Sequence, residues 1–306
     1  FTPLAAGLWV YQAEFSEDAY VEYSLIRGGA GVPDPLNRRR VPNGLGGRNQ
    51  FFYMPKATPT PLAQHGRNVR RGTITRHLIH LDQRRGGGCR AVHLYRPPSV
   101  ERVPLLVVFD GSDYMKYARL AVIVDNLIAE SRIRPLAMAF VDNAGPTRMI
   151  EYGAGETLPL LLLNELLPLA RGELDLLDVE AEPGAFGLLG ASMGGLASLY
   201  TALRLPHIFG RVLAQSGAFT LFGWDTVVYD LVRDGPVRPL RIWMDCGGLE
   251  QLVETNRRMH ALLQAKGYDV CYREYSGGHH WTAWRDDVWR GLEALFPPPI
   301  PVERPV

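Results

Sequence analysis

Residues 190–195 read Gly-Ala-Ser-Met-Gly-Gly, and they join two segments of different character. The apolar run 185–189 before them is typical of a buried strand, and 196–204 carries a helical pattern. A serine between glycines at such a junction is typical of a nucleophile elbow, a tight turn that lifts the serine Oγ clear of the sheet edge. Side chains at positions 190 and 194 are expected to collide with the strand or the helix start. Ser192 is therefore the candidate nucleophile.

The composition is that of an ordinary globular protein of 306 residues, with 46% hydrophobic residues and a net charge of +1. This balance gives no electrostatic case for nucleic acid or an anionic membrane as partner, and no apolar run reaches the length of about 18 residues that a membrane span needs. Cys89, Cys246 and Cys271 provide neither a disulfide framework nor metal-ligand spacing. We therefore expect no metal, no cofactor and a reduced, cytoplasmic protein. The oligomeric state is left open, as is a leader or first strand removed before Phe1.

The pattern of the chain changes near residue 70. Alternating apolar residues over 9–15 and 21–25 predict half-buried strands, and turn residues and a Pro/Thr linker follow. We expect 1–70 to be a small β-sandwich that begins partway through, with its linker. Over 71–306, strands and helices alternate, which predicts one doubly wound α/β sheet. The predicted strands are 73–81, 90–96, 104–109, 136–142, 185–189, 211–215, 240–245 and 269–275, and the predicted helices are 117–130, 156–171, 193–204, 252–266 and 281–295.

The remaining catalytic candidates follow Ser192 in the order acid, then histidine, as in α/β-hydrolases. His279 comes after the last predicted strand and two glycines, so its loop reaches the same sheet edge as Ser192. Asp245 and Glu250 both follow the preceding strand. We favour Glu250, which lies past the turn, whereas Asp245 continues the strand and could face away. The carboxylate would orient the imidazole and stabilise the imidazolium.

Two backbone N–H groups are expected to form an oxyanion hole. One belongs to Met193, the residue after the nucleophile, and the other comes from the loop after the third strand of the fold. In this chain that loop starts at Asp110, and Gly111 would let it turn so that the Ser112 N–H faces the site.

Together with these residues, further motifs follow in a fixed order over 72–296: Val108–Gly111, Phe140–Asp142, Arg148, Glu151–Tyr152, Asn164–Pro168, Gln215–Gly217, Gly247 with Glu250, and Gly277–His279. In this series the chain resembles the esterase-D superfamily, most closely its enterochelin esterase branch. The N-terminal part, with Tyr23, 34–37 and Met54-Pro55, resembles the immunoglobulin-like domain that precedes such esterases.

The resemblance implies an α/β-hydrolase fold with Ser192 as nucleophile, Glu250 as acid and His279 as base, and with Ser112 and Met193 as oxyanion donors. The family often has Asp after the catalytic histidine, and here that residue is His280, which leaves open which of the two is the base.

The resemblance also implies a substrate, the ester or lactone bonds of a catecholate siderophore, often in its anionic iron complex. A pocket for such a molecule should offer arginine and aromatic side chains, and the candidates are Arg148, Tyr114, Trp224, His280 and Trp281. Two alternatives remain: a general short-chain or feruloyl carboxylesterase, and a non-catalytic ligand-binding protein. The intact order of serine, acid and histidine favours an enzyme.

Overall fold

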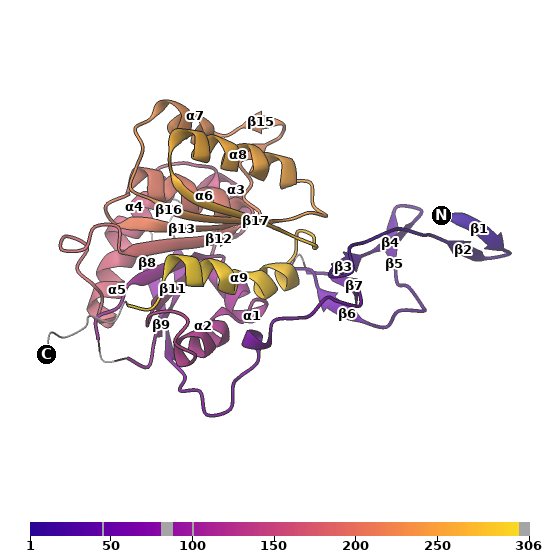
Figure 1. The fold of residues 1–306 in the computed structure, drawn as a ribbon, viewed down its shortest axis with the longest axis horizontal. Helices are drawn as coiled ribbons and strands as arrows, with labels where there is room; N and C mark the ends of the chain where they lie inside the picture. The colour runs from indigo at the N-terminus through magenta and orange to yellow at the C-terminus, as the bar shows by residue number, and fades with distance from the viewer. Residues whose placement is uncertain (45, 81–87, 100, 300–306) are drawn as a thin grey trace, which may run out of the picture.

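The computed structural model describes residues 1–44, 46–80, 88–99 and 101–299, and an eight-stranded sheet forms its centre (Figure 1). All eight predicted strands are confirmed to within two residues, and residue 81 of the first lies outside the described residues. They are β8 (Thr73–His80), β9 (Cys89–Arg96), β10 (Leu105–Phe109), β11 (Ala137–Val141), β12 (Phe186–Ala191), β13 (Phe209–Gln215), β16 (Arg241–Gly247) and β17 (Asp269–Tyr275).

The order across the sheet is β17-β16-β13-β12-β10-β11-β9-β8. The six strands from β17 to β11 pair in parallel, and β9 and β8 are antiparallel to their neighbours. Every residue of β10, β11 and β12 is buried, as expected for parallel strands covered on both faces. The carboxyl ends of the parallel strands therefore meet at one edge, and the loops that leave them share one end of the molecule.

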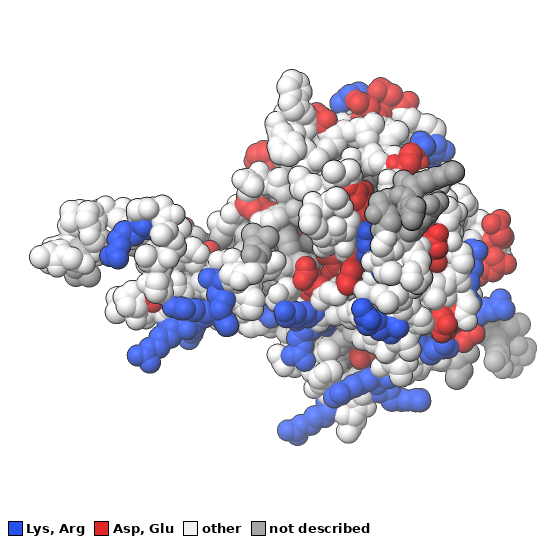
Figure 2. All heavy atoms as spheres, turned by 180° about the vertical axis from the view of Figure 1, so that it is seen from behind, with Lys and Arg blue, Asp and Glu red and all other residues white. Residues whose placement is uncertain are grey.

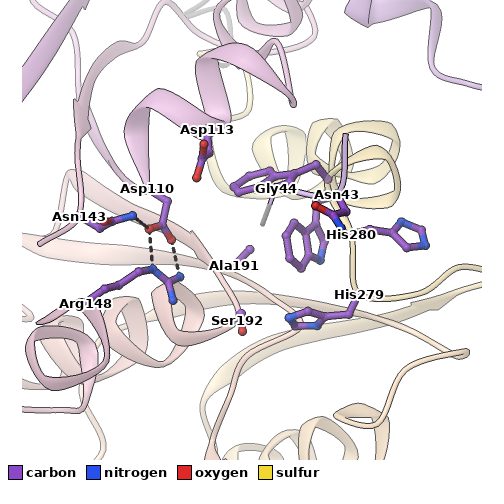
Figure 3. A pocket seen from close by; sticks show the side chains of 12 residues that line it. Asn43, Gly44, Asp110, Asp113, Asn143, Arg148, Ala191, Ser192, His279 and His280 are labelled. Carbon is purple, nitrogen blue, oxygen red and sulfur yellow. Dashed lines mark hydrogen bonds and ion pairs between the residues drawn. The ribbon is translucent and has the colours of Figure 1, made fainter. Parts of the chain in front are cut away.

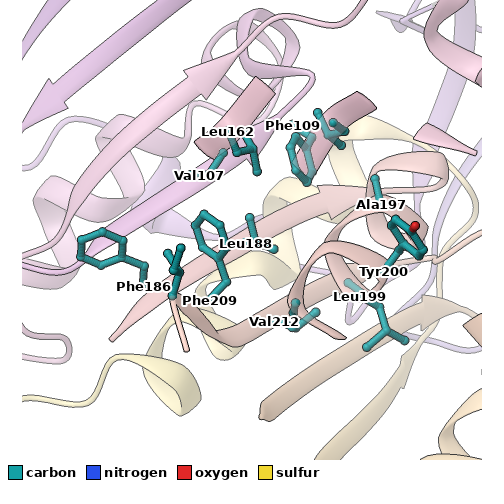
Figure 4. Close-up of a cluster of buried hydrophobic side chains, with 14 of the residues drawn as sticks. Val107, Phe109, Leu162, Phe186, Leu188, Ala197, Leu199, Tyr200, Phe209 and Val212 are labelled. Atoms are coloured by element: carbon teal, nitrogen blue, oxygen red, sulfur yellow. The ribbon is translucent and has the colours of Figure 1, made fainter. Parts of the chain in front are cut away.

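Helices cover both faces of the sheet (Figure 1). One face packs against α4 (Thr157–Leu161), the π-helical turn η4 (Leu162–Leu166), α5 (Leu167–Glu173), α6 (Met193–Arg204), α7 (Val227–Asp234) and α8 (Val253–Lys266). The other packs against α1 (Gly111–Lys116), α2 (Leu120–Ala129) and α9 (Trp281–Leu295). Figure 4 shows the first of these cores, where Val212 of β13 lies near Leu199 of α6 and Phe209 lies beside Phe186 of β12.

The five predicted helices are present, and the sequence patterns missed three short ones. These are α1, α7 and α3 (Arg148–Tyr152), which follows the 3-10 turn η3 (Gly145–Thr147). Helices of five to eight residues carry too few turns for an apolar period to stand out. Gly267 ends α8 in the left-handed conformation, with φ 87°.

Residues 1–53 form antiparallel β structure beside the large sheet (Figure 1). The hairpins are β1 (Thr2–Ala5) with β2 (Leu8–Val10) and β4 (Leu25–Arg27) with β5 (Ala30–Val32), and the three-stranded sheet has the order β3 (Tyr20–Tyr23), β7 (Arg48–Tyr53), β6 (Arg40–Pro42). The strand predicted over 9–15 is wrong: β2 ends at Val10, and Trp9 and Tyr11 are exposed rather than half-buried. An immunoglobulin-like sandwich stays a prediction.

The N-terminal sheet is attached to the loop that follows β17. The Tyr20 N–H donates to the Ser276 carbonyl at 3.0 Å, and the Tyr20 hydroxyl donates to Thr282 Oγ1 at 3.2 Å. Farther along, η1 (Pro61–Ala63) leads the chain towards β8, and the Thr60 N–H donates to Asp286 Oδ1 at 3.2 Å. These contacts attach β3 and the segment around Thr60 to the loop before α9 and to its first turns.

Charge is unevenly spread over the surface. Figure 2 shows lysine and arginine side chains gathered on the N-terminal part and along the underside of the molecule, with acidic groups mostly above them. In the part of the chain that the structure describes, no helix is both long and apolar enough to cross a bilayer.

Candidate active site

Ser192 stands at the junction of β12 and α6, in a conformation that few non-glycine residues adopt. Its φ and ψ are 58° and −120°, values that cost strain and persist only where the surroundings enforce them. Two backbone hydrogen bonds do so here: the Ser192 N–H donates to the Gln215 carbonyl at 2.9 Å, and the Ala218 N–H donates to the Ser192 carbonyl at 3.0 Å. The elbow is thus fastened to the end of β13.

The three glycines around Ser192 differ in how little space they leave for a side chain. A Cβ at Gly190 would lie 2.4 Å from the carbonyl group of Gly194, so position 190 tolerates no side chain. The collision expected at Gly194 itself is not found, because a Cβ there would meet its nearest atom at 3.4 Å. The tighter position is Gly195, whose Cβ would lie 3.0 Å from the Cα of Gly217.

The two predicted oxyanion donors differ in their surroundings. Met193 is the first residue of α6, and its N–H has no hydrogen-bond partner among the described residues. The Ser112 N–H instead donates to Asp142 Oδ1 at 2.9 Å, so the expectation that it faces the site is wrong for this structure. The Asp142 carboxylate, directly after the neighbouring strand β11, accepts the hydrogen bond from this N–H group. Gly111, the first residue of α1, keeps an N–H without a partner in the described part of the chain.

Glu250 and His279 are in direct contact through Glu250 Oε2 and His279 Nδ1. The Glu250 side chain is 1% exposed and that of His279 is 35% exposed, so a buried carboxylate holds an imidazole that reaches solvent. Glu250 Oε1 accepts from the Ser216 hydroxyl at 2.5 Å and from the Gly247 N–H at 2.7 Å. Burial alone would raise the pKa of Glu250, but the contacts with His279, Ser216 and Gly247 outweigh it and lower that pKa.

Asp245, the alternative acid, lies elsewhere. It is fully buried, and its carboxylate accepts from Trp243 Nε1 at 3.0 Å and from Gln215 Nε2 at 3.3 Å. Burial, reinforced by the charge of Asp287, raises its pKa well above the usual range. The carboxylate beside His279 is thus that of Glu250.

A second layer of groups fixes this pair. Trp284 Nε1 donates to Ser216 Oγ at 2.9 Å, and Ser216 in turn donates to Glu250. The Trp284 ring also meets the His279 ring edge-on, with centroids 4.9 Å apart. The imidazole is therefore held by its acid at one nitrogen and by an indole at its side.

Ser192 and His279 line one cavity of about 250 Å³ at the carboxyl edge of the sheet. Figure 3 shows the His279 ring directed towards Ser192, with Ala191 beside the serine. Between the two side chains the described residues show no hydrogen bond, as is common before substrate binds. The other lining residues are Asn43, Gly44, Asp110, Asp113, Asn143, Arg148, His280, Trp281 and Trp284.

Arg148, a predicted substrate-binding residue, is held by Asp110. Its Nε and Nη2 donate to the two oxygens of that carboxylate at 2.7 and 2.6 Å, and Asn143 Nδ2 donates to the same group at 2.7 Å (Figure 3). Asp110 has φ 53° and begins the loop that carries Gly111. This bidentate ion pair between Arg148 and Asp110 therefore stabilises the turn that would present an oxyanion donor.

His280 lines the cavity, but its imidazole points towards the N-terminal sheet (Figure 3). The ring meets that of Tyr20 edge-on at 5.3 Å, and Nδ1 lies 3.5 Å from Glu22 Oε1. Burial lowers the pKa of His280 to about 4, so the ring is neutral at ordinary pH. It faces away from Ser192, whereas the His279 ring is directed towards it.

Two further substrate-binding expectations are wrong. Tyr114 is completely buried, and its hydroxyl donates to Gln215 Oε1 at 3.0 Å, because α1 turns it under the loop instead of into the cavity. Trp224, which is 79% exposed, lies on β15 (Trp224–Asp225) opposite β14 (Thr220–Leu221) and does not line the cavity. Trp281 does line it, and packs edge-on against Tyr114 at 5.1 Å.

Sequence reasoning missed the residues that the N-terminal part brings to the cavity. Asn43 and Gly44 form part of its wall, and a Cβ at Gly44, which has φ 78°, would lie 2.5 Å from Trp281 Nε1. The run Pro42-Asn43-Gly44 read only as a turn, because sequence carries no signal for a contact between residues so far apart. Asp113 was missed as well; its neighbours Asp110 and Gly111 gave the only hint.

Comparison with known proteins agrees with this geometry. Residues 86–295 match the model of the esterase family, described as "Putative esterase". The chain belongs to this esterase family. This chain is 31% identical over 291 residues to an iron(III) enterobactin esterase of Dickeya dadantii, covering 87% of this chain and 65% of the relative, and 26% identical over 280 residues to that of Escherichia coli, covering 87% and 68%. It thus spans about two thirds of the length of these curated relatives.

A solved structure supports the same fold. The enterobactin esterase from Shigella flexneri, crystallised in the presence of enterobactin, superposes with a TM-score of 0.75 at 25% identity, over 87% of this chain and 69% of that one. This chain therefore has the α/β-hydrolase fold, as the strand order also indicates.

Proposed function

We propose that this chain is a serine carboxylic ester hydrolase in which Ser192 is the nucleophile, His279 the general base and Glu250 the acid that orients it. The observation that carries the proposal is the contact of buried Glu250 with His279 at the wall of the cavity into which the strained Ser192 projects. A strained serine, an imidazole and a carboxylate with a lowered pKa together serve nucleophilic acyl transfer.

The chemistry follows from the atoms. With Nδ1–H donating to Glu250, His279 Nε2 keeps its lone pair and accepts the Ser192 proton as Oγ attacks the ester carbonyl carbon. The oxyanion formed lies at the N-terminus of α6, where Met193 N–H donates, and we propose Gly111 N–H as its second donor. The alcohol then leaves with the proton from His279, and water hydrolyses the acyl-enzyme by the same steps.

The substrate that we propose is an ester or lactone of a catecholate siderophore, because the relatives are named for enterobactin. Trp281 in the cavity wall offers an aromatic face, and Arg148, whose Nε and Nη2 donate to Asp110, also lines the cavity. A general short-chain or feruloyl carboxylesterase is the alternative, since nothing in the cavity excludes a smaller ester.

We further propose two domains, 1–70 and 71–306, and a cytoplasmic location that suits three free cysteines.

Hydrolysis of three ester classes tests this proposal. We expect turnover of enterobactin, methyl ferulate and 4-nitrophenyl butyrate, with the highest kcat/KM on enterobactin. Turnover of the two simple esters alone would favour the general carboxylesterase. If no ester were hydrolysed while enterobactin still bound, the chain would be a non-catalytic ligand-binding protein.

Replacing Glu250 by Gln should lower kcat by about 10³-fold, because the amide cannot stabilise the imidazolium. Asp245→Asn is the matched control, since Asp245 is equally buried but points to Gln215 and Trp243. It should retain kcat within about tenfold. Steady-state kinetics on 4-nitrophenyl butyrate measures both, and the reverse ranking would make Asp245 the acid.

Replacing Arg148 by Met should lower kcat/KM by about 10- to 100-fold on neutral and anionic esters alike. The change leaves the buried Asp110 carboxylate without its bidentate ion pair and loosens the Gly111 loop. This differs from the selective loss on anionic esters that a pure substrate contact would give. Arg204→Met, which removes an exposed partner of Glu156, is the control and should change little. Loss confined to anionic esters would show that Arg148 acts through the substrate.

A further inference from the structure

One carboxylate in the cavity has no function in the mechanism above. Asp113 lies in the first turn of α1, and Figure 3 shows its carboxylate pointing into the space above Ala191 and Ser192. It lines the same cavity as Ser192 and His279, and its side chain has no hydrogen-bond or ion-pair partner among the residues described. A carboxylate placed this way is free to meet a bound substrate.

Asp113 also gives the cavity wall a net negative charge. Of the carboxylates and guanidinium that line it, Asp110 and Arg148 neutralise each other through their bidentate ion pair. Lys116, one turn further along α1, is exposed and forms no ion pair with Asp113. The charge of Asp113 therefore remains uncompensated beside the reacting centre.

The surroundings of Asp113 make it a strong acceptor. Burial raises the pKa of Asp113, the charges of Asp110 and Asp142 raise it further, and Arg148 and Lys116 oppose them. Asp113 is partly buried, and a carboxylate that has lost part of its hydration without gaining a donor from the protein is stabilised by a donor that a ligand supplies. The same group is destabilised by a second negative charge brought next to it.

We propose that Asp113 determines specificity: it accepts a hydrogen bond from a hydroxyl of the ester bound at Ser192 and rejects a negative charge at the same place. The inference rests on the proposed function and narrows its substrate class to esters that bear a hydroxyl donor, uncharged, beside the scissile bond.

Three methyl benzoates of nearly equal shape test the inference: methyl 3-hydroxybenzoate, methyl 3-methoxybenzoate and methyl 3-carboxybenzoate. In the wild type we expect kcat/KM in that order, with the hydroxyl ester about tenfold above the methoxy ester and the carboxylate ester about fivefold below it. In Asp113→Asn the carboxylate ester should rise to the level of the methoxy ester, and the advantage of the hydroxyl ester should shrink. Each comparison is a ratio within one variant, so a general loss of activity cancels.

Asp269→Asn is the matched control, because Asp269 starts β17 at the amino edge of the sheet and pairs with Arg241 at the surface. It removes the same charge far from the cavity and should leave all three ratios unchanged. Ratios unchanged in Asp113→Asn, with Ser192→Ala inactive on every ester, would overturn the inference alone. Hydrolysis of the methoxy ester by Ser192→Ala would instead overturn the proposed function.

Discussion

Ser192→Ala is expected to lower kcat by about 10⁴-fold or more on every ester, the largest loss of any single substitution discussed for this chain. The substitution removes the attacking oxygen and nothing else, because alanine keeps the Cβ and both backbone bonds: its N–H donates to the Gln215 carbonyl and its carbonyl accepts from the Ala218 N–H. The melting temperature should therefore stay within a few degrees of the wild type. Steady-state kinetics with 4-nitrophenyl butyrate and a thermal melt measure both.

A covalent probe gives an independent reading of the same prediction. A fluorophosphonate should modify one serine, found by mass spectrometry in the peptide that contains 190–195, and Ser192→Ala should abolish the label. Ser198→Ala is the control, since Ser198 is buried in α6 and donates to the Gly194 carbonyl. Turnover by Ser192→Ala within 100-fold of the wild type would place the nucleophile elsewhere.

His279→Ala is expected to cost nearly as much as Ser192→Ala, because a serine without its base is a poor nucleophile and the two act as a unit. His280→Gln should retain kcat within about fivefold, since that ring packs on Tyr20 and faces away from the serine. The adjacent position makes it a matched control for the fold of the loop.

The two histidine variants are best compared on one small ester, so that binding differences stay small. The double variant Ser192→Ala, His279→Ala should be no slower than either single variant, as expected for a unit. A His280→Gln variant as inactive as His279→Ala would mean that the orientation of the loop, rather than His279 alone, sets the rate.

The α/β sheet could be predicted from the sequence because its central strands are continuous apolar runs. The 105–109 and 137–141 segments have no polar residue, and a parallel strand covered on both faces needs that pattern. The elbow at Ser192 followed from glycines next to the apolar run 185–189, and the loop at His279 followed from the two glycines after the last predicted strand. The N-terminal strands could not be predicted as well: in small sheets packed on one side, alternation is short, and Trp9 and Tyr11 satisfy it while remaining exposed.

The finer geometry of the site depends on contacts between segments far apart in sequence. Whether Ser112 N–H is free depends on the Asp142 carboxylate 30 residues on, and whether Tyr114 reaches the cavity depends on Gln215, 101 residues on. A local sequence pattern does not reveal either of these two long-range contacts. Glu250 was preferred to Asp245 because it lies past the turn after β16, and its contact with His279 agrees with that preference, whereas Asp245 accepts from Trp243 Nε1.

The contact of the N-terminal sheet with the His279 loop has an evolutionary consequence. Tyr20 bonds to Ser276, and Gly44 leaves room for Trp281, so the first 60 residues shape a cavity whose chemistry lies more than 130 residues away. Recombination that replaced this segment by an unrelated one would remove part of the substrate wall and a support of the base. The two segments are therefore expected to be inherited together, and a change on one side of their junction should be followed by a compensating change on the other.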